Sequence, residues 1–85
     1  LGDVYKRQEQ QEIEKNRDLL KYDDEIISLR TNVKRAAEAK VANGTLTVTD
    51  LMREINNEDL AKQDKIQHEI ELLLSIYNLK YTTNN

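Results

Sequence analysis

Residues 43–50 read NGTLTVTD, and this stretch decides the fold because it holds the point where the chain is expected to turn. The chain of 85 residues has no proline and two glycines, one of them Gly44. Glycine readily adopts the left-handed backbone conformation that ends many helices. Thr47 and Asp50 follow with the spacing of a capping box, which stabilises the first turn of a helix. The sequence therefore predicts a first helix over 9–42, a tip over 43–47 and a second helix over 48–80.

Both arms carry apolar residues at the alternating three- and four-residue spacing of a coiled coil. The strongest line of the first arm, which we expect to contact the second arm, is Leu19, Tyr22, Ile26, Leu29, Val33 and Ala36. A weaker line on an adjacent face is Ile13, Leu20 and Ile27. The main line of the second arm is Leu51, Ile55, Ile66, Ile70, Leu73 and Tyr77, and its second line is Leu72, Ile76 and Leu79. We therefore expect an all-α fold, a long antiparallel two-helix coiled-coil hairpin with arms of roughly 50 Å.

The two ends of the chain are expected to lie outside this hairpin. Residues 1–8 read LGDVYKRQ, and their last six residues resemble the in-frame translation of a transposon-end sequencing adapter, as found on metagenomic gene fragments. We interpret them as such an artefact, with native sequence continuing upstream; the alternative is that Val4 and Tyr5 form an early helical turn. Residues 81–85 are expected to be a frayed exit or a linker.

Composition and charge exclude several function classes. The net charge of −3 gives no basic footprint for nucleic acid. No apolar run approaches the roughly 20 residues of a membrane-spanning helix. We find no catalytic arrangement, no phosphate-binding glycine loop and no metal-ligand cluster, so we expect neither an enzyme nor a cofactor. The single histidine, His68, and the acidic run 23–25 are expected to lie on solvated helix faces.

The tip and the second arm resemble one known family, the TolC-like outer-membrane efflux proteins. Residues 43–52, NGTLTVTDLM, match the pattern x-G-T-x-T-x-x-D-L/V-L found at the tip of the C-terminal helical hairpin in that family. Residues 60–61 and the line Ile70, Leu73, Tyr77 and Leu79 are similar to the packing positions of the family's closing helix. The resemblance covers about residues 19–83.

This resemblance implies a fragment of a trimeric channel that combines an outer-membrane β-barrel with a periplasmic α-barrel. The segment would be periplasmic, and contact with the membrane would come only through the barrel, which lies outside this chain. The hairpin tip would contact a periplasmic adaptor protein, which couples the channel to an inner-membrane pump or secretion transporter. The residues implied at the adaptor contact are Gly44, Thr45, Leu46 and Thr47.

Two positions near the tip depart from the family pattern. Asp50 matches an acidic residue that lines the channel entrance in some members, but it also suits helix capping. Leu46 stands where those members have a basic residue that latches the closed state, and Arg53 stands where they have a second acidic one. These differences put the acidic gate and its latch in doubt. Leu46, if exposed at the tip, has the weakest structural role there and is therefore the strongest candidate for adaptor contact.

The alternative function is a general antiparallel coiled-coil module, such as a chaperone-like or adaptor hairpin, with an accidental tip resemblance. Each arm carries a second apolar line, which favours assembly with further helices over an isolated two-helix rod. A helical arm of an enzyme is a third, minor alternative.

Overall fold

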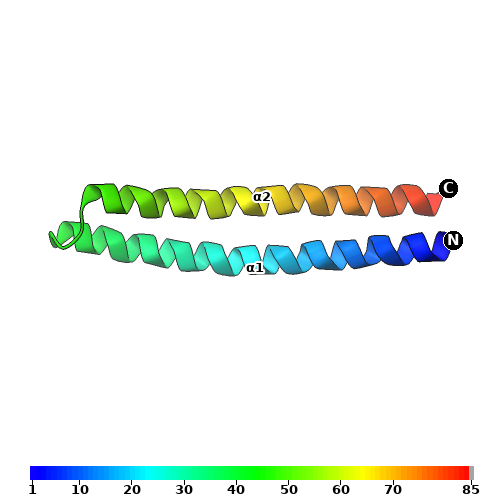
Figure 1. Cartoon of the computed structure of the whole chain (residues 1–85), viewed down its shortest axis with the longest axis horizontal. Helices are drawn as coiled ribbons and strands as arrows, with labels where there is room; N and C mark the ends of the chain where they lie inside the picture. The colour runs from blue at the N-terminus through cyan, green and yellow to red at the C-terminus, as the bar shows by residue number, and fades with distance from the viewer. Residues whose placement is uncertain (85) are drawn as a thin grey trace.

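The computed structural model describes the backbone of residues 1–84 and the side chains of residues 1–80. These residues form two long helices, α1 (Gly2–Ala42) and α2 (Val48–Asn84), which lie antiparallel along their whole length (Figure 1). The hairpin measures 63 × 14 × 12 Å, and both termini lie at the end opposite the turn. The predicted all-α fold of two long helices in a hairpin is therefore confirmed.

A Schellman motif ends α1. Asn43 keeps right-handed dihedral angles, and Gly44 alone among the described residues adopts a positive φ, of 75°. The backbone N–H of Gly44 donates to the carbonyl of Val41 at 3.0 Å, and that of Thr45 donates to the carbonyl of Lys40 at 2.9 Å. These two bonds satisfy carbonyl groups that the end of the helix would otherwise leave open.

Thr47 is the N-cap of α2. Its hydroxyl accepts a hydrogen bond from the backbone N–H of Asp50 at 3.2 Å, and the same hydroxyl donates to the Asp50 carboxylate at 2.7 Å. The Thr47 carbonyl accepts the first helical bond, from Leu51 at 3.2 Å. The Asp50 carboxylate lies in the first turn, where it also complements the helix dipole.

Both helices are longer than the sequence pattern indicated. α1 begins at Gly2 instead of residue 9, and α2 continues to Asn84 instead of residue 80, because no proline or glycine interrupts either extension. The adapter origin of residues 1–8 is not a structural property and stays a prediction. Of the expected C-terminal exit, Asn85 lies outside the described residues.

The contact between the helices does not use the strongest apolar line, and this part of our prediction is wrong. Tyr22 and Leu29 of that line are each 60% exposed, and Tyr77 of the second arm is 65% exposed. The weaker first-arm line, with Ile13 buried and Leu20 and Ile27 half-buried, faces α2 instead.

We call the line of contact between the helices the seam. On α2 the seam residues, all buried or half-buried, recur every three and four positions without interruption, and they are Leu51, Glu54, Glu58, Ala61, Lys65, His68, Leu72, Ser75 and Leu79. On α1 the seam residues are Ile13, Asn16, Leu20, Asp23, Ile27, Thr31, Lys34, Ala37 and Val41. Many of these side chains are polar or charged. The residue spacing is therefore that of a coiled coil, but the side chains are not the predominantly apolar ones of a regular coiled coil.

The turn allows a direct test of the conformation of Gly44. Replacing Gly44 with valine should lower the free energy of unfolding by at least about 1 kcal/mol, because a Cβ atom opposes the left-handed conformation. A Cβ atom there would meet nothing within 4 Å, so the cost is one of backbone strain and not of crowding. Urea denaturation followed by circular dichroism measures the change.

Gly44→Asn is the matched control, because asparagine tolerates the left-handed region better than other residues. It should lose clearly less stability than Gly44→Val. Equal losses in both variants would show that the strain argument does not hold.

Candidate functional site

The predicted tip residues lie together at the closed end of the hairpin. Gly44 makes the turn, and the Thr45 hydroxyl donates to the carbonyl of Lys40 at 3.1 Å. The Thr47 hydroxyl is engaged by Asp50. The polar groups of the tip therefore stabilise the ends of the two helices, and both threonine hydroxyls already have partners within the chain.

Asp50 and Arg53, the predicted entrance residues, lie next to each other in the first turns of α2. The closest approach between the Arg53 guanidinium and the Asp50 carboxylate is 3.8 Å, on an exposed surface. An exposed ion pair of this kind contributes little to stability. Asp50 therefore serves mainly as a capping residue within this chain.

The apolar side chains that the tip exposes differ from the one expected. Leu46, the favoured contact residue, is half-buried. Val48 and Met52 are 61% and 59% exposed, and Ile55 continues the same side of α2. Sequence reasoning missed them because it treated the start of α2 as a packed line. Their spacing on one face, beside a capped helix start, is the signal that could have found them.

The middle of the seam holds a buried carboxylate paired with the single histidine. Asp23 is 4% exposed, and its Oδ2 atom lies 2.5 Å from Nδ1 of half-buried His68. The hydrogen bond that the Asp23 carboxylate accepts from the imidazole, together with the negative charge of Asp23, raises the pKa of His68 above the ordinary 6.5. Both residues were expected on solvated faces, and that expectation is wrong because they fall on the seam spacing.

A second ion pair, between Asp24 and Lys65, lies next to the Asp23–His68 pair. The Lys65 ammonium lies 2.6 Å from Oδ1 of Asp24, and that hydrogen bond raises the pKa of Lys65. Lys65 also approaches Glu69, at 4.0 Å along its own helix. Two adjacent carboxylates of α1, at 23 and 24, are thus each paired with a base from α2.

Toward the tip, Glu58 is buried between basic residues of both helices. Its carboxylate accepts a hydrogen bond from Lys34 of α1 at 3.0 Å, and Lys62 lies 3.4 Å away. The hydroxyl of Thr31 and the ammonium group of Lys34 hold the pKa of Glu58 at about 2, far below the ordinary 4.5. Because Glu58 is 4% exposed, its charge would be costly without these partners.

Toward the termini, a neutral polar pair occupies the seam. The Asn16 side chain donates a hydrogen bond to the hydroxyl of Ser75 at 2.9 Å, and Ser75 donates to the Glu71 carbonyl at 2.9 Å. Asn16 and Ser75 are both buried. A buried asparagine at such a position specifies the register of a coiled coil at some cost in stability.

Most of the large apolar residues excluded from the seam form two stripes on opposite faces of the hairpin, and Leu60, Ile70, Leu74 and Tyr77 of α2 are exposed outside both stripes. The stripe on α1, stripe 1, is Leu19, Tyr22, Ile26, Leu29 and Val33. The stripe on α2, stripe 2, is Val48, Met52, Ile55, Ile66, Leu73 and Ile76. Stripe 1 shares a face with the α2 residues Asn57, Leu60 and Asp64, because these line one shallow groove together with Ile26.

Helix geometry places stripe 2 on the other face. Asn57 and Ile55 are two residues apart, which corresponds to a rotation of about 200° around the helix. The seam residues Glu54 and Glu58 lie between their two directions. Since Asn57 lies on the face of stripe 1, Ile55 and the rest of its stripe lie on the opposite face.

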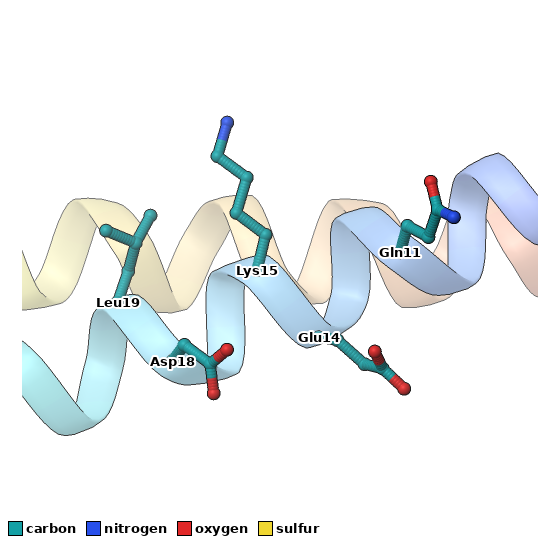
Figure 2. Close-up of a pocket in the computed structure, with 5 residues that line it drawn as sticks. All are labelled: Gln11, Glu14, Lys15, Asp18 and Leu19. Carbon is teal, nitrogen blue, oxygen red and sulfur yellow. The ribbon is translucent and has the colours of Figure 1, made fainter.

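One depression on the described surface is lined by Gln11, Glu14, Lys15, Asp18 and Leu19, all from α1 (Figure 2). Lys15 and Leu19 point to one side of the helix, and Glu14 and Asp18 to the other. Their side chains therefore do not converge on a common point where a ligand would be held.

Among the described residues, no group of three or more histidine and carboxylate side chains is placed to hold a metal ion. Neither described helix contains a segment whose hydropathy and length would suit it to crossing a bilayer. Comparison with known protein families, curated proteins and solved structures yields no match.

The low pKa of Glu58 makes part of the stability acid-sensitive. Its contribution is complete above pH 4.5, the ordinary value, and is lost as the pH falls from 4.5 toward about 2. Glu58→Gln should therefore reduce the loss of stability over this range, although it should lower stability at neutral pH by leaving Lys34 without its partner. Urea midpoints measured at several pH values test this.

Glu25→Gln is the matched control because Glu25 is an exposed carboxylate on α1. Its acid sensitivity should follow that of the parent chain. If Glu58→Gln and the parent lose stability equally between pH 4.5 and about 2, the ion pair does not determine the acid response.

Proposed function

We propose that the chain is a periplasmic helical hairpin of an outer-membrane efflux or type I secretion channel, resembling the TolC-like family. The hairpin would form part of a helical ring in a homotrimer, and its tip would dock a periplasmic adaptor protein that couples the channel to an inner-membrane pump. In this role the hairpin would line a conduit for the exported substrate and bind the adaptor protein, and it would catalyse no reaction. The proposal rests on the tip pattern of residues 43–52 together with the distribution of apolar surface.

The observation that carries the proposal is that buried polar residues share the seam with its apolar residues, while two apolar stripes lie outside on opposite faces. Leu29 in stripe 1 and Leu73 in stripe 2 are 60% and 66% exposed. Extended apolar surface of this kind marks sites of protein association. A rod that functioned alone would instead place its best apolar line between its own helices.

Opposite faces also favour one type of assembly over another. A two-fold dimer that packs one face against its own copy buries only one of the two stripes. Packing stripe 1 of one hairpin on stripe 2 of the next buries both, and it repeats from copy to copy. Such heterologous contacts close into rings when the rotation between copies allows it. A ring of helices is the architecture that the resemblance implies.

The assembly mode is testable with the 85-residue chain. The parent chain should self-associate, and Leu29→Glu and Leu73→Glu should each be monomeric because each lacks one of the two complementary surfaces. Mixing the two variants should restore a dimer, since each retains the surface that the other has lost. Sedimentation velocity measures the masses.

Ser28→Glu is the control, because Ser28 is exposed on α1 beside Leu29 but outside stripe 1. It should associate like the parent. A dimer formed by either variant alone would indicate face-to-face pairing, and a monomeric parent would favour an isolated coiled-coil module.

Docking at the tip gives a second test, in the complete channel. Leu46→Asp should weaken binding of the periplasmic adaptor and reduce efflux while leaving the trimer intact, because it places a charge on an apolar tip contact. Thr49→Asp is a suitable control, since Thr49 is already exposed and polar. Unchanged adaptor binding and efflux in Leu46→Asp would remove this residue from the docking surface.

The gene region upstream of residue 9 tests the proposal as a whole. It should encode a second helical hairpin and the strands of a β-barrel. If a longer, adapter-trimmed assembly shows neither, the channel assignment is wrong and the general coiled-coil module takes its place.

A further inference from the structure

The centre of the seam holds an ionisable pair, whereas a neutral polar or apolar pair at this layer would also join the two helices. A buried carboxylate, Asp23, contacts the only histidine of the chain across the two helices. An apolar pair at this layer would hold the helices together without any dependence on pH. Histidine is the side chain whose charge changes near neutral pH.

We propose that Asp23 and His68 form a pH-controlled clasp, which holds the two arms together at mid-length when His68 is protonated and loosens when it loses the proton. The bond joins α1 to α2 directly, 45 residues apart in the sequence. It spans the rod far from the turn, so the Schellman motif at Gly44 cannot replace it. The inference concerns this chain alone and stands independently of the channel assignment.

The charges around the clasp determine how protonation of His68 affects the contact between the two helices. From α1, Asp23 and Asp24 face this region, and Arg30 lines the same groove as Asp23. From α2, the acidic groups near His68 are Asp64 and Glu71, and the neighbouring base Lys65 also approaches Glu69. Deprotonation of His68 therefore removes a positive charge from a cluster in which carboxylates outnumber bases, and the best-buried of these carboxylates loses its charged partner.

The sign of the effect follows from the raised pKa of His68. A group whose pKa is higher in the folded state stabilises that state fully below its unfolded value, here 6.5. That stabilisation is lost as the pH rises above 6.5 and through the folded value. Closure of the arms at this layer is therefore favoured by mild acid and weakened by base.

The first measurement is the NMR titration of His68, which is unambiguous because the chain has a single histidine. In the parent the midpoint should lie above 6.5, and in Asp23→Asn it should fall toward 6.5. Asp24→Asn is the matched control, because Asp24 pairs with Lys65 and not with His68, and its midpoint should stay raised. Equal midpoints in the parent and Asp23→Asn, with both helical by circular dichroism, would overturn the proposal.

The second measurement follows the distance between the two helices. The chain has no cysteine, so spin labels at Glu25→Cys and Gln63→Cys, both exposed, report the distance between α1 and α2 by electron paramagnetic resonance. The distance distribution should be narrow below pH 6.5 and broaden above the titration of His68. His68→Lys, which keeps its positive charge, should stay narrow throughout.

These outcomes separate a clasp from a passive contact. If the parent distribution does not change while His68 titrates, the pair does not control the arms. If His68→Lys broadens in the same pH range as the parent, another group is responsible. Should Asp23→Asn be unfolded, the parent titration and the His68→Lys comparison still decide the question.

Discussion

Burying polar groups between two helices imposes the constraint on which the rest of this structure depends. A charge removed from water is tolerated only when a partner meets it, so each polar residue in the seam restricts what may lie opposite. Asn16 meets Ser75, Asp23 meets His68, and Glu58 meets Lys34. A shift of one heptad would separate all three pairs. The seam therefore specifies a single register, as buried polar residues do in other coiled coils, at some cost in stability.

The same constraint explains why the apolar residues lie outside. Because polar pairs occupy much of the seam, stripe 1 and stripe 2 are left on opposite outer faces, where a single hairpin cannot cover them. The hydrophobic contribution to folding is therefore incomplete in a single copy. Register is set within the chain, and most of the apolar burial would be supplied between chains. This division of roles suits a component of a helical assembly better than an independent rod.

The turn and the helices could be predicted because they depend on local chemistry. The residues that form the seam could not be predicted in this way. Gly44, Thr47 and Asp50 act through bonds within a few residues, so their pattern in the sequence indicates their structure directly. The choice of helix face depends on contacts about 45 residues apart, and we chose the most apolar line. Folding the sequence back at the middle of the tip, between residues 45 and 46, would have shown the useful signal, because Asp23 then lies opposite His68 and Asn16 opposite Ser75. At the tip, Leu46 is half-buried, whereas Val48 and Met52, which the sequence pattern did not single out, are exposed.

The tip and the flank of α2 are not separate surfaces. Stripe 2 begins at Val48, the first residue of α2, and continues through Met52 and Ile55 along the rod. The capping bonds of Thr47 and Asp50 fix the start of the helix and hence the direction in which Val48 and Met52 project. A partner that docked on the tip would therefore meet the same apolar face that a neighbouring hairpin would cover. Docking and lateral assembly would then share the part of stripe 2 nearest the tip, so the packing of a neighbour on α2 would determine how much of the tip remains accessible to the partner.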